Sequence, residues 1–330
     1  MYATTEGTTR YNERFPRYRD AAFYRPVFGL QVSTLGIGTY LGDGDAADPA
    51  YTEALMAAGE GGINLFDTAI NYRGQRSERC IGAAVRKLQR DEIVVCTKAG
   101  FLTPGAVPSF LKPEQVVGRM HSMDPDFLAD QVDRSRVNMG LDTIDVFYLH
   151  NPETQLGFIE RGEFDERIGR AFERLERLVE ARKIRWYGAA TWDGFRMKGA
   201  LSLPRMVEIA AEVGGPEHHF RFVQLPFNIG MVEAYVEQPE SVLRAAVRLG
   251  IAVIASATLS QTQVLANMPA RLTSLLPELT NAQQAIQFTR STPGIAAALV
   301  GMGQSGHVRE NLGVAAHAPI PAAEYQRLYQ

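Results

Sequence analysis

The chain has little cysteine, no long hydrophobic run and no surplus of positive charge. Only two cysteines, Cys80 and Cys96, occur among its 330 residues, which is too few for a disulfide framework. Both lie in apolar patterns, so we expect reduced thiols in the core. No apolar run approaches the ~20 residues of a membrane-spanning helix, and the polar N-terminus lacks the apolar segment of a signal peptide. We therefore expect a soluble cytoplasmic protein with no membrane partner.

The charge balance argues against a nucleic-acid partner. Lysine and arginine number 34 against 37 acidic residues, which gives a formal net charge of −3, so the chain lacks the basic face that nucleic acids require. No metal site is expected either, because His218 and His219 are adjacent and on a strand would face opposite sides. No coiled-coil seam or exposed apolar stripe indicates a subunit interface, so the sequence leaves the oligomeric state open.

The glycine-rich fingerprint of a doubly wound dinucleotide-binding fold is also absent. Glycines occur between positions 29 and 42, but they lack the GxGxxG spacing followed by a helix and a downstream acid. An open doubly wound sheet is thus the weaker architecture for this chain. If the protein holds a cofactor, it must hold it in another way.

The chain does contain a regular alternation of apolar runs and helical patterns. In the segment from 164 to 183, for example, one helix face carries Phe164, Ile168, Phe172, Leu175 and Val179. The apolar runs that read as buried strands number eight: 34–39, 63–68, 92–98, 144–150, 186–191, 220–228, 251–258 and 294–302. Strands that alternate with helices indicate parallel βαβ units, and eight of them predict a single α/β domain of the (β/α)₈ TIM-barrel class.

The barrel domain is expected to span residues 25–330. Residues 1–24 form a polar N-terminal extension, which either packs on the barrel exterior or is partly disordered. Three connections are longer than ordinary loops, namely 99–123, 151–163 and 259–280. All three follow strands at the same end of the barrel, so we expect them to form walls or lids of a substrate pocket.

Polar residues end three successive strands at that end. Asp67 ends the second run, Lys98 the third and His150 the fourth, and Tyr72 follows Asp67 by five residues. In a βα barrel these positions form the rim that carries catalytic residues. Singly, each has an ordinary explanation: a helix cap, a rim aromatic, a solvent-facing lysine or a core histidine. Their joint placement favours a proton-transfer site.

The chemistry of the four residues fits that interpretation. A free phenol has a pKa near 10, and an ammonium within about 4–6 Å favours the phenolate and lowers that pKa. Lys98 supplies the ammonium and Asp67 is placed to orient it. A neutral His150 would hydrogen-bond a substrate carbonyl oxygen. The set suits protonation of an oxygen on which negative charge develops.

The stretch FDTAINYRGQRSERCIG (66–82) resembles the signature of the aldo-keto reductase family, as do TLGIGTY, CTKAGF, DVFYLHNP, VQLPFN and HVRENLG in order along about 300 residues. The resemblance implies a (β/α)₈ barrel and NAD(P)H-dependent reduction of an aldehyde or ketone, or the reverse. It also implies a catalytic tetrad of Asp67, Tyr72, Lys98 and His150, with Tyr72 as the general acid. In this family the segment from Arg25 to Val32 would be a hairpin that closes the barrel floor.

The same resemblance implies where the cofactor is held. Gln224 fits the residue that bonds the nicotinamide carboxamide, but Ala190 and Thr191 stand where the family commonly has Ser-Asn, and Ser256 where it often has a stacking Tyr; Trp192 or Tyr40 would have to replace that Tyr. Gly301 and His307 replace two cations typical of NADP-selective members, which leaves Arg309 nearby, so NADP(H) is only slightly favoured over NAD(H). The implied cofactor-binding residues are Thr39, Tyr40, Asp67, Thr191, Gln224, Ser256, Leu259, Gly303, Gln304, His307, Glu310 and Asn311.

Two other functions remain as alternatives. The first is a cofactor-sensing regulatory or partner-binding subunit on the same barrel, with slow or no turnover. The second, a phosphate-handling lyase or isomerase, has little support. For the enzyme, Phe101, Phe110, Trp192 and Phe227 are expected to wall an apolar pocket for neutral carbonyl substrates, and His121 is a further candidate for its lining.

Overall fold

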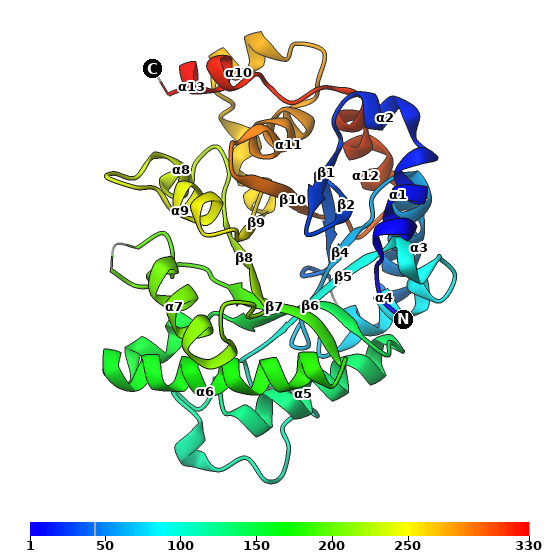
Figure 1. The fold of residues 1–330 in the computed structure, drawn as a ribbon. Helices are drawn as coiled ribbons and strands as arrows, with labels where there is room; N and C mark the ends of the chain where they lie inside the picture. Colours follow the sequence, from blue (N-terminus) through cyan, green and yellow to red (C-terminus); the bar gives the residue numbers. More distant parts are fainter. Residues whose placement is uncertain (43, 198, 330) are drawn as a thin grey trace.

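The eight predicted strands form a closed parallel barrel in the computed structural model, which describes residues 1–42, 44–197 and 199–329 (Figure 1). Neighbouring strands follow the order β10-β3-β4-β5-β6-β7-β8-β9 around the barrel. The predicted TIM-barrel class is therefore confirmed. The strands are β3 (Leu35–Gly38), β4 (Leu65–Asp67), β5 (Val94–Ala99), β6 (Ile144–His150), β7 (Ile184–Ala190), β8 (Phe220–Pro226), β9 (Ala252–Ser256) and β10 (Ile295–Gly301).

The strands form where the sequence is apolar without interruption. Every residue of β5 and of β6 is buried, because parallel strands in a barrel are covered by side chains on one face and by helices on the other. The predicted strand boundaries differ from the observed ones by a few residues. The run from 92 to 98, for example, begins with the end of a 3₁₀ turn, η1 (Arg90–Glu92), and β5 starts only at Val94.

The helices surround the barrel, and capping residues mark several of their ends. The Asp124 side chain accepts from the backbone N–H groups of Asp126 and Phe127 and so caps α5, and Gly62 ends α3 with a φ of 116°. In the described part of the chain, no helix is long and apolar enough to cross a membrane. The α-helices are α1 (Thr5–Glu13), α2 (Pro16–Asp20), α3 (Asp48–Gly61), α4 (Arg76–Val85), α5 (Pro125–Met139), α6 (Arg161–Glu180), α7 (Leu203–Gly214), α8 (Glu233–Val236), α9 (Val242–Arg248), α10 (Ala270–Leu275), α11 (Asn281–Ser291), α12 (Ser305–Asn311) and α13 (Ala322–Arg327), and the remaining 3₁₀ segments are η2 (Pro113–Gln115), η3 (Pro152–Gly157), η4 (Ser260–Ala266) and η5 (Leu312–Ala316).

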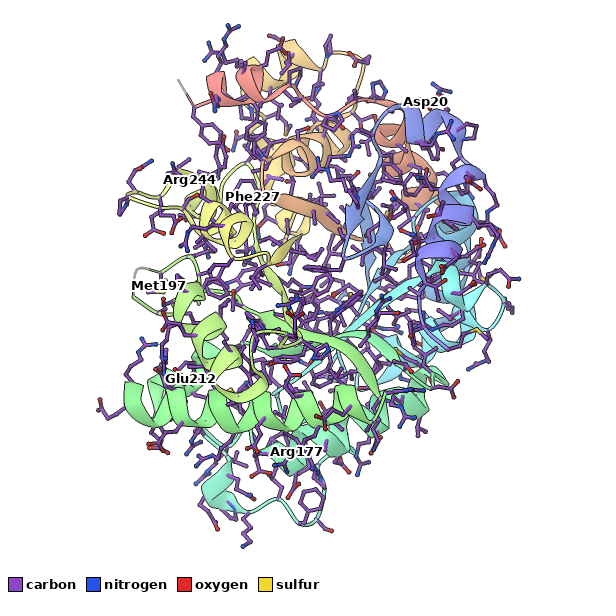
Figure 2. All side chains as sticks on the ribbon, in the orientation of Figure 1. Asp20, Arg177, Met197, Glu212, Phe227 and Arg244 are labelled. Carbon is purple, nitrogen blue, oxygen red and sulfur yellow. The ribbon has the colours of Figure 1, made fainter. Side chains whose placement is uncertain are left out.

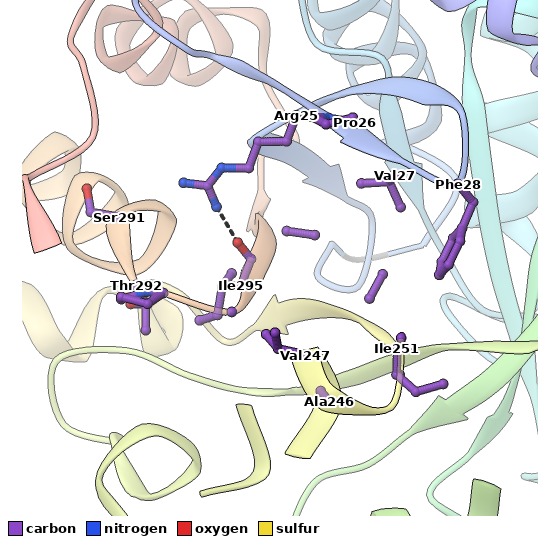
Figure 3. Close-up of a pocket in the computed structure, with 15 residues that line it drawn as sticks. Arg25, Pro26, Val27, Phe28, Ala246, Val247, Ile251, Ser291, Thr292 and Ile295 are labelled. Carbon is purple, nitrogen blue, oxygen red and sulfur yellow. Dashed lines mark hydrogen bonds between the residues drawn. The ribbon is translucent and has the colours of Figure 1, made fainter. Parts of the chain in front are cut away.

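A hairpin closes the lower, N-terminal end of the barrel. Its strands are β1 (Tyr24–Val27) and β2 (Leu30–Ser33), and the Phe28 ring at its turn lies against the rings of Trp186 and Phe222 inside the barrel. Beside the hairpin is a cavity of about 470 Å³ (Figure 3). Arg25 lines it, but its guanidinium already donates to the backbone oxygens of Ile295 and Arg290. This cavity lies at the end of the barrel opposite the polar rim.

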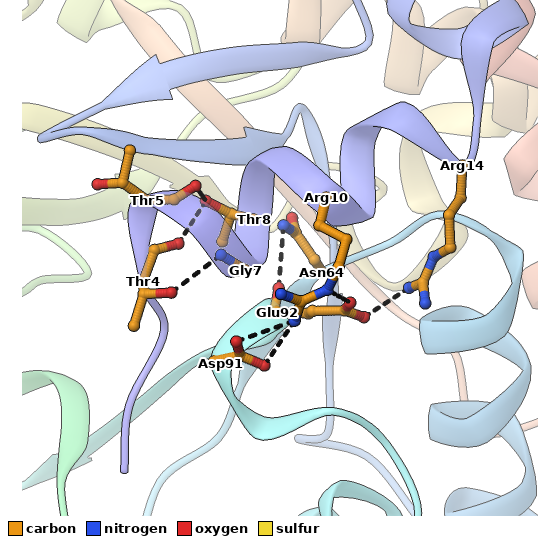
Figure 4. A network of polar contacts seen from close by, with 9 residues as sticks. All are labelled: Thr4, Thr5, Gly7, Thr8, Arg10, Arg14, Asn64, Asp91 and Glu92. Atoms are coloured by element: carbon orange, nitrogen blue, oxygen red, sulfur yellow. Dashed lines mark hydrogen bonds and ion pairs between the residues drawn. The ribbon is translucent and has the colours of Figure 1, made fainter.

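The N-terminal extension packs on the outside of the barrel as two helices, α1 and α2 (Figure 1). The Thr4 side chain caps α1, and Tyr11 is almost fully buried. Arg10 and Arg14 both bond the Glu92 carboxylate, at 2.9 and 2.6 Å (Figure 4). Glu92 is itself only 2% exposed. Of the two alternatives for residues 1–24, the structure shows external packing.

The first and last strands of the barrel meet at a seam. Leu35 to Gly38 of β3 pair with Ala298 to Gly301 of β10. The buried Arg290 of α11 strengthens this seam, because its Nε donates to the Thr34 hydroxyl at 2.9 Å. The barrel is thus closed by residues about 260 positions apart in the sequence.

Candidate active site

Three neighbouring strands bring the four predicted catalytic residues together at the upper rim. Asp67 and His150 are the last residues of β4 and β6, and Lys98 is the last residue but one of β5. Lys98 pairs with Tyr148 of β6 in the parallel register, two residues before His150. Tyr72 lies in the turn after β4, where its N–H donates to the Ala69 oxygen at 3.0 Å.

Lys98 is a buried ammonium held by two oxygens. Its side chain is 1% exposed, and Nζ lies 2.6 Å from Asp67 Oδ1 and 2.6 Å from the Thr68 carbonyl oxygen. Burial alone would lower the pKa of Lys98, but the Asp67 carboxylate and the Tyr72 phenol act the other way, and the net pKa is raised. Lys98 is therefore charged at neutral pH. The second carboxylate oxygen of Asp67 accepts from the Gln224 amide at 2.8 Å.

Tyr72 lies directly beside this ion pair. Its ring centroid is 4.9 Å from Lys98 Nζ, and its ring meets that of Tyr40 at 4.9 Å. Burial raises the pKa of Tyr72 more than Lys98 lowers it, so the net pKa lies above the ordinary value of a tyrosine. The expectation of a lowered pKa is wrong for the net shift, because sequence reasoning included the cation and omitted the desolvation. Tyr72 is thus a protonated phenol at neutral pH.

His150 completes the site as a neutral imidazole. Its ring lies 5.8 Å from the Tyr72 ring. Burial, together with Lys98 and His121, holds the pKa of His150 well below its usual range. Nδ1 is buried and has no hydrogen-bond partner in the part of the chain that the structure describes. An orphaned N–H is rarer than an orphaned acceptor, so the proton belongs on Nε2, which makes His150 a hydrogen-bond donor.

A chain of hydrogen bonds supports His150 from behind. His121 Nε2 lies 2.8 Å from the His150 carbonyl oxygen, and the Gln155 amide nitrogen lies 2.9 Å from His121 Nδ1. The Gln155 oxygen accepts from Arg167 at 2.8 Å. Gln155 therefore donates to Nδ1, and His121 donates through Nε2. Burial lowers the pKa of His121 to about 4, which keeps it neutral.

A cavity of about 790 Å³ opens at this rim. Asp67, Tyr72 and His150 line it, and it extends along residues 256–263 to Gly301. The volume and the concave shape fit a bound organic cofactor or substrate. The hydroxyl of Thr258 and the Asn71 side-chain oxygen are buried without a partner in the described part of the chain, so the walls offer unused hydrogen-bonding groups.

The cavity is lined by all the predicted cofactor residues up to Leu259 and by none of those near the C-terminus. The predicted residues that line it are Thr39, Tyr40, Asp67, Thr191, Gln224, Ser256 and Leu259. Outside its lining are Gly303, Gln304, His307, Glu310 and Asn311, which lie on or just before the seven-residue helix α12. There Asn311 is buried, whereas His307, Arg309 and Glu310 are exposed.

Only part of the predicted aromatic wall is present. Phe101 and Trp192 line the cavity. Phe227 does not, because it is fully buried and stacks on Phe288 at 6.1 Å, inside the packed region shown in Figure 2. Phe110 is 51% exposed and also lies outside the lining. His121, also a candidate for the pocket lining, is not part of it, since it is fully buried behind Phe101 and His150.

Three lining residues, Leu41, Asn71 and Met231, lie outside every residue and connection that was predicted for the pocket. Asn151 and the segment from Gln261 to Gln263 also line the cavity, and they belong to the connections 151–163 and 259–280, which were expected to form its walls. A signal existed for the two asparagines. Asn71 directly precedes Tyr72, and Asn151 directly follows His150, so the positions beside the predicted catalytic residues were candidates. The other residues depend on loop conformation, which residue spacing does not encode.

Known proteins share both the sequence pattern and the fold. The NADH-specific methylglyoxal reductase of Escherichia coli (strain K12) is 27% identical over 191 residues, which are 56% of this chain and 56% of that protein. The D-threo-aldose 1-dehydrogenase of a Pseudomonas species is 32% identical over 163 residues, 46% of this chain and 47% of that protein. The chain thus matches about half the length of these relatives.

The solved structures show the same barrel. An aldo/keto reductase from Klebsiella pneumoniae, in complex with NADP and acetate, superposes with a TM-score of 0.68 over 93% of both chains at 19% identity. At that identity the likeness concerns the fold alone. The sequence model described as the aldo/keto reductase family matches residues 34–271. That match covers more than half of the chain, and the chain therefore belongs to the aldo/keto reductase family.

Proposed function

We propose that this protein is an NAD(P)H-dependent oxidoreductase that reduces an aldehyde or ketone to an alcohol, or catalyses the reverse reaction. The observation that carries the proposal is the ion-paired Lys98, whose Nζ lies 4.9 Å from the Tyr72 ring beside a neutral His150. The names of the Escherichia coli and Pseudomonas relatives, a methylglyoxal reductase and an aldose dehydrogenase, support this reaction class.

Each residue of the tetrad has a separate task. Tyr72, protonated at rest, donates its proton to the carbonyl oxygen of the substrate. Lys98 stabilises the phenolate that this transfer leaves behind. Asp67, bonded by Lys98 and Gln224, keeps the ammonium charged and in place. His150 donates a hydrogen bond to the substrate oxygen. The nicotinamide, when bound, supplies the hydride.

The cavity residues are those that would hold the nicotinamide half of the cofactor. Gln224, Thr191 and Thr39 offer polar groups beside the tetrad, and Ser256 and Leu259 form the opposite wall. In place of the family's stacking Tyr, Ser256 contributes no ring. Tyr40 and Trp192 both line the cavity and are the aromatic residues available to pack on the nicotinamide.

The adenosine half would reach the segment around α12, with Gly303 and Gln304 before the helix and His307, Glu310 and Asn311 on it. We propose a slight preference for NADP(H) over NAD(H). The exposed His307 and Arg309 are available for a 2′-phosphate. A solved structure of similar fold contains NADP, whereas the Escherichia coli relative is named as NADH-specific, so the margin is small.

Two measurements test the function. Purified protein is first titrated with NADPH and with NADH while tryptophan fluorescence is recorded, and binding of at least one is expected. Reduction of a panel of aldehydes and ketones is then followed for the wild type and for Tyr72→Phe. The variant is expected to bind the cofactor as the wild type does and to lose turnover. Full activity of the variant would refute the role of Tyr72, and no binding of either nucleotide would refute the proposed function.

A regulatory subunit remains the second candidate, because a putative voltage-gated potassium channel subunit beta of Schizosaccharomyces pombe is 27% identical over 197 residues, 58% of this chain and 52% of that protein. A tightly bound oxidised cofactor, very slow turnover with every carbonyl tested and a stable complex with another protein would favour it.

A further inference from the structure

A carboxylate in the loop after β6, that of Glu153, accepts hydrogen bonds from the backbone of the loop after β7. Glu153 lies in η3, three residues beyond His150. Its Oε1 accepts hydrogen bonds from three consecutive backbone N–H groups: Trp192 at 2.7 Å, Asp193 at 3.1 Å and Gly194 at 3.1 Å. One oxygen therefore bonds three backbone N–H groups near the start of a loop, just beyond the end of β7.

The loop after β7, which Glu153 holds, forms part of the cavity wall. Thr191 and Trp192 both line the cavity. The Thr191 N–H still bonds the Gln224 carbonyl oxygen at 2.8 Å, but beyond it the backbone N–H groups of residues 192–194 turn to Glu153. Gly194 packs closely there, since a Cβ at this position would lie 2.6 Å from Leu201 Cδ1. The contact with Glu153 thus fixes the backbone position from which the Trp192 side chain extends.

The position of the carboxylate is specific and is not that of an ordinary surface charge. Burial raises the pKa of Glu153 more than the backbone N–H groups lower it. Its second oxygen, Oε2, is buried without a partner in the described ranges of the chain. Hydrogen bonds from N–H groups to a carboxylate are stronger than those to a neutral acceptor. Such a group ties two loops together with one side chain.

The two tied loops carry neighbouring parts of the site, because β6 and β7 pair directly in the barrel. His150 ends β6 and its loop begins with Asn151, and the loop after β7 begins with Thr191 and Trp192. We propose that Glu153 is a positioning residue, which holds Thr191 and Trp192 against the cavity and so sets the affinity of the site for the nicotinamide and for the carbonyl substrate beside it. The kinetic part of this proposal rests on the proposed reductase function, and its spectroscopic part does not.

Trp192 itself gives the spectroscopic readout. The chain has two tryptophans, and the other, Trp186, lies at the barrel floor against Phe28. In a Trp186→Phe background, which keeps an aromatic ring at that contact, emission comes from Trp192 alone. Acrylamide quenching then measures how well the loop holds this indole, with no cofactor or substrate present.

Glu153→Ala, Glu153→Gln and a control, Glu160→Ala, are compared in that background. Glu160 lies in the same connection and is exposed. Trp192 is already 47% exposed, so we expect its quenching constant to rise moderately in Glu153→Ala. It is expected to stay near the parent value in Glu153→Gln, which retains an acceptor oxygen, and in the control. The proposal would be overturned if the quenching constant of Glu153→Ala equalled that of the parent. It would also be overturned if the quenching constant rose equally in the alanine and glutamine variants.

Kinetics give the second readout in the otherwise native protein. We expect KM for the carbonyl to rise about tenfold in Glu153→Ala, consistent with loss of charge-assisted hydrogen bonds, while kcat stays within about threefold because Tyr72 and Lys98 are untouched. A fall in kcat with unchanged KM would contradict the positioning role. A wild type without turnover would instead refute the proposed function, and the quenching test would still decide the role of Glu153.

A further variant keeps the proposal testable if Glu153→Ala does not fold, as judged by its thermal melt. Glu153→Asp retains the charge but draws the oxygen back by one methylene from the three N–H groups. Raised quenching in folded Glu153→Asp supports the proposal, and quenching equal to that of the parent overturns it.

Discussion

Replacing Lys98 by methionine tests the centre of the site. At an effective dielectric constant of about 20, two unit charges separated by the 4.9 Å between Lys98 Nζ and the Tyr72 ring centroid attract by about 3 kcal/mol. That stabilisation applies when Tyr72 becomes a phenolate and is absent when it is a neutral phenol. Lys98→Met is therefore expected to lower kcat by about 10²–10³-fold.

The same substitution leaves a buried carboxylate without its cation. Asp67 is 4% exposed and would retain only the Gln224 amide as a side-chain partner. Breaking a buried ion pair in this way costs about 3–5 kcal/mol of folding free energy. The double variant Lys98→Met/Asp67→Asn removes the unpaired charge and keeps an acceptor for Gln224, so it is expected to regain most of the stability and none of the activity.

The assay combines single-turnover reduction, urea denaturation and a surface control. Lys87→Met removes a lysine that is exposed on the surface and is expected to change neither rate nor stability. If folded Lys98→Met retained kcat within about threefold of the wild type, the reasoning from charge and distance would be refuted. If the double variant regained activity along with stability, Lys98 would be a structural residue only.

Three further predictions concern other parts of the molecule. Because the pKa of His121 is lowered to about 4 in the fold, its contribution to stability is complete above pH 6.5 and is lost as the pH falls toward 4. Between pH 7.5 and pH 5.0, urea denaturation should show the free energy of unfolding of the wild type falling by about 2 kcal/mol more than that of His121→Gln. Equal falls would refute the neutral state of His121. Arg14→Ala removes one of the two cations on the 2%-exposed Glu92 and should lower the free energy of unfolding by about 1–3 kcal/mol, measured by urea denaturation against the exposed Arg17→Ala; an unchanged value would show that the N-terminal packing does not depend on this contact. Ser256→Tyr should tighten nicotinamide cofactor binding by up to about tenfold through ring stacking, measured by fluorescence titration; weaker binding would show that the wall at this position has no room for a ring.

The sequence predicted the features that depend on periodicity and strand order. Continuous apolar runs predicted eight strands, and their polar ends predicted the meeting of Asp67, Lys98 and His150, because parallel strands of a barrel end at one rim. Alternating helix patterns were equally informative: Phe164 and Ile168 of α6 are buried as expected. Near the C-terminal end of α6 the buried face differs from the prediction, since Leu178 is buried there and Val179 is half-buried.

The features that depend on loop paths and desolvation were not predictable in the same way. Phe110 and Phe227 lie in segments after strands, but only the actual path of each loop decides which side chain faces the cavity. The net pKa shift of Tyr72 depends on how completely the ring is buried, a quantity that sequence spacing does not contain. The N-terminal helices are a different case. Thr4 followed by Glu6 in the first turn is a recognisable start signal, although the partner of Arg10 and Arg14 lies about 80 residues away.

The seam between β3 and β10 can form only after almost the whole chain has been synthesised. Leu35 pairs with Ala298, so the first barrel strand leaves the ribosome long before the strand that covers its open side. During that interval β3 and its growing sheet present an unpaired edge, the feature through which strands of different chains join. Contacts of such long range also slow folding. Yield in cells is therefore expected to respond to substitutions at the seam, such as Thr34 and Arg290, more strongly than the stability of the finished barrel does.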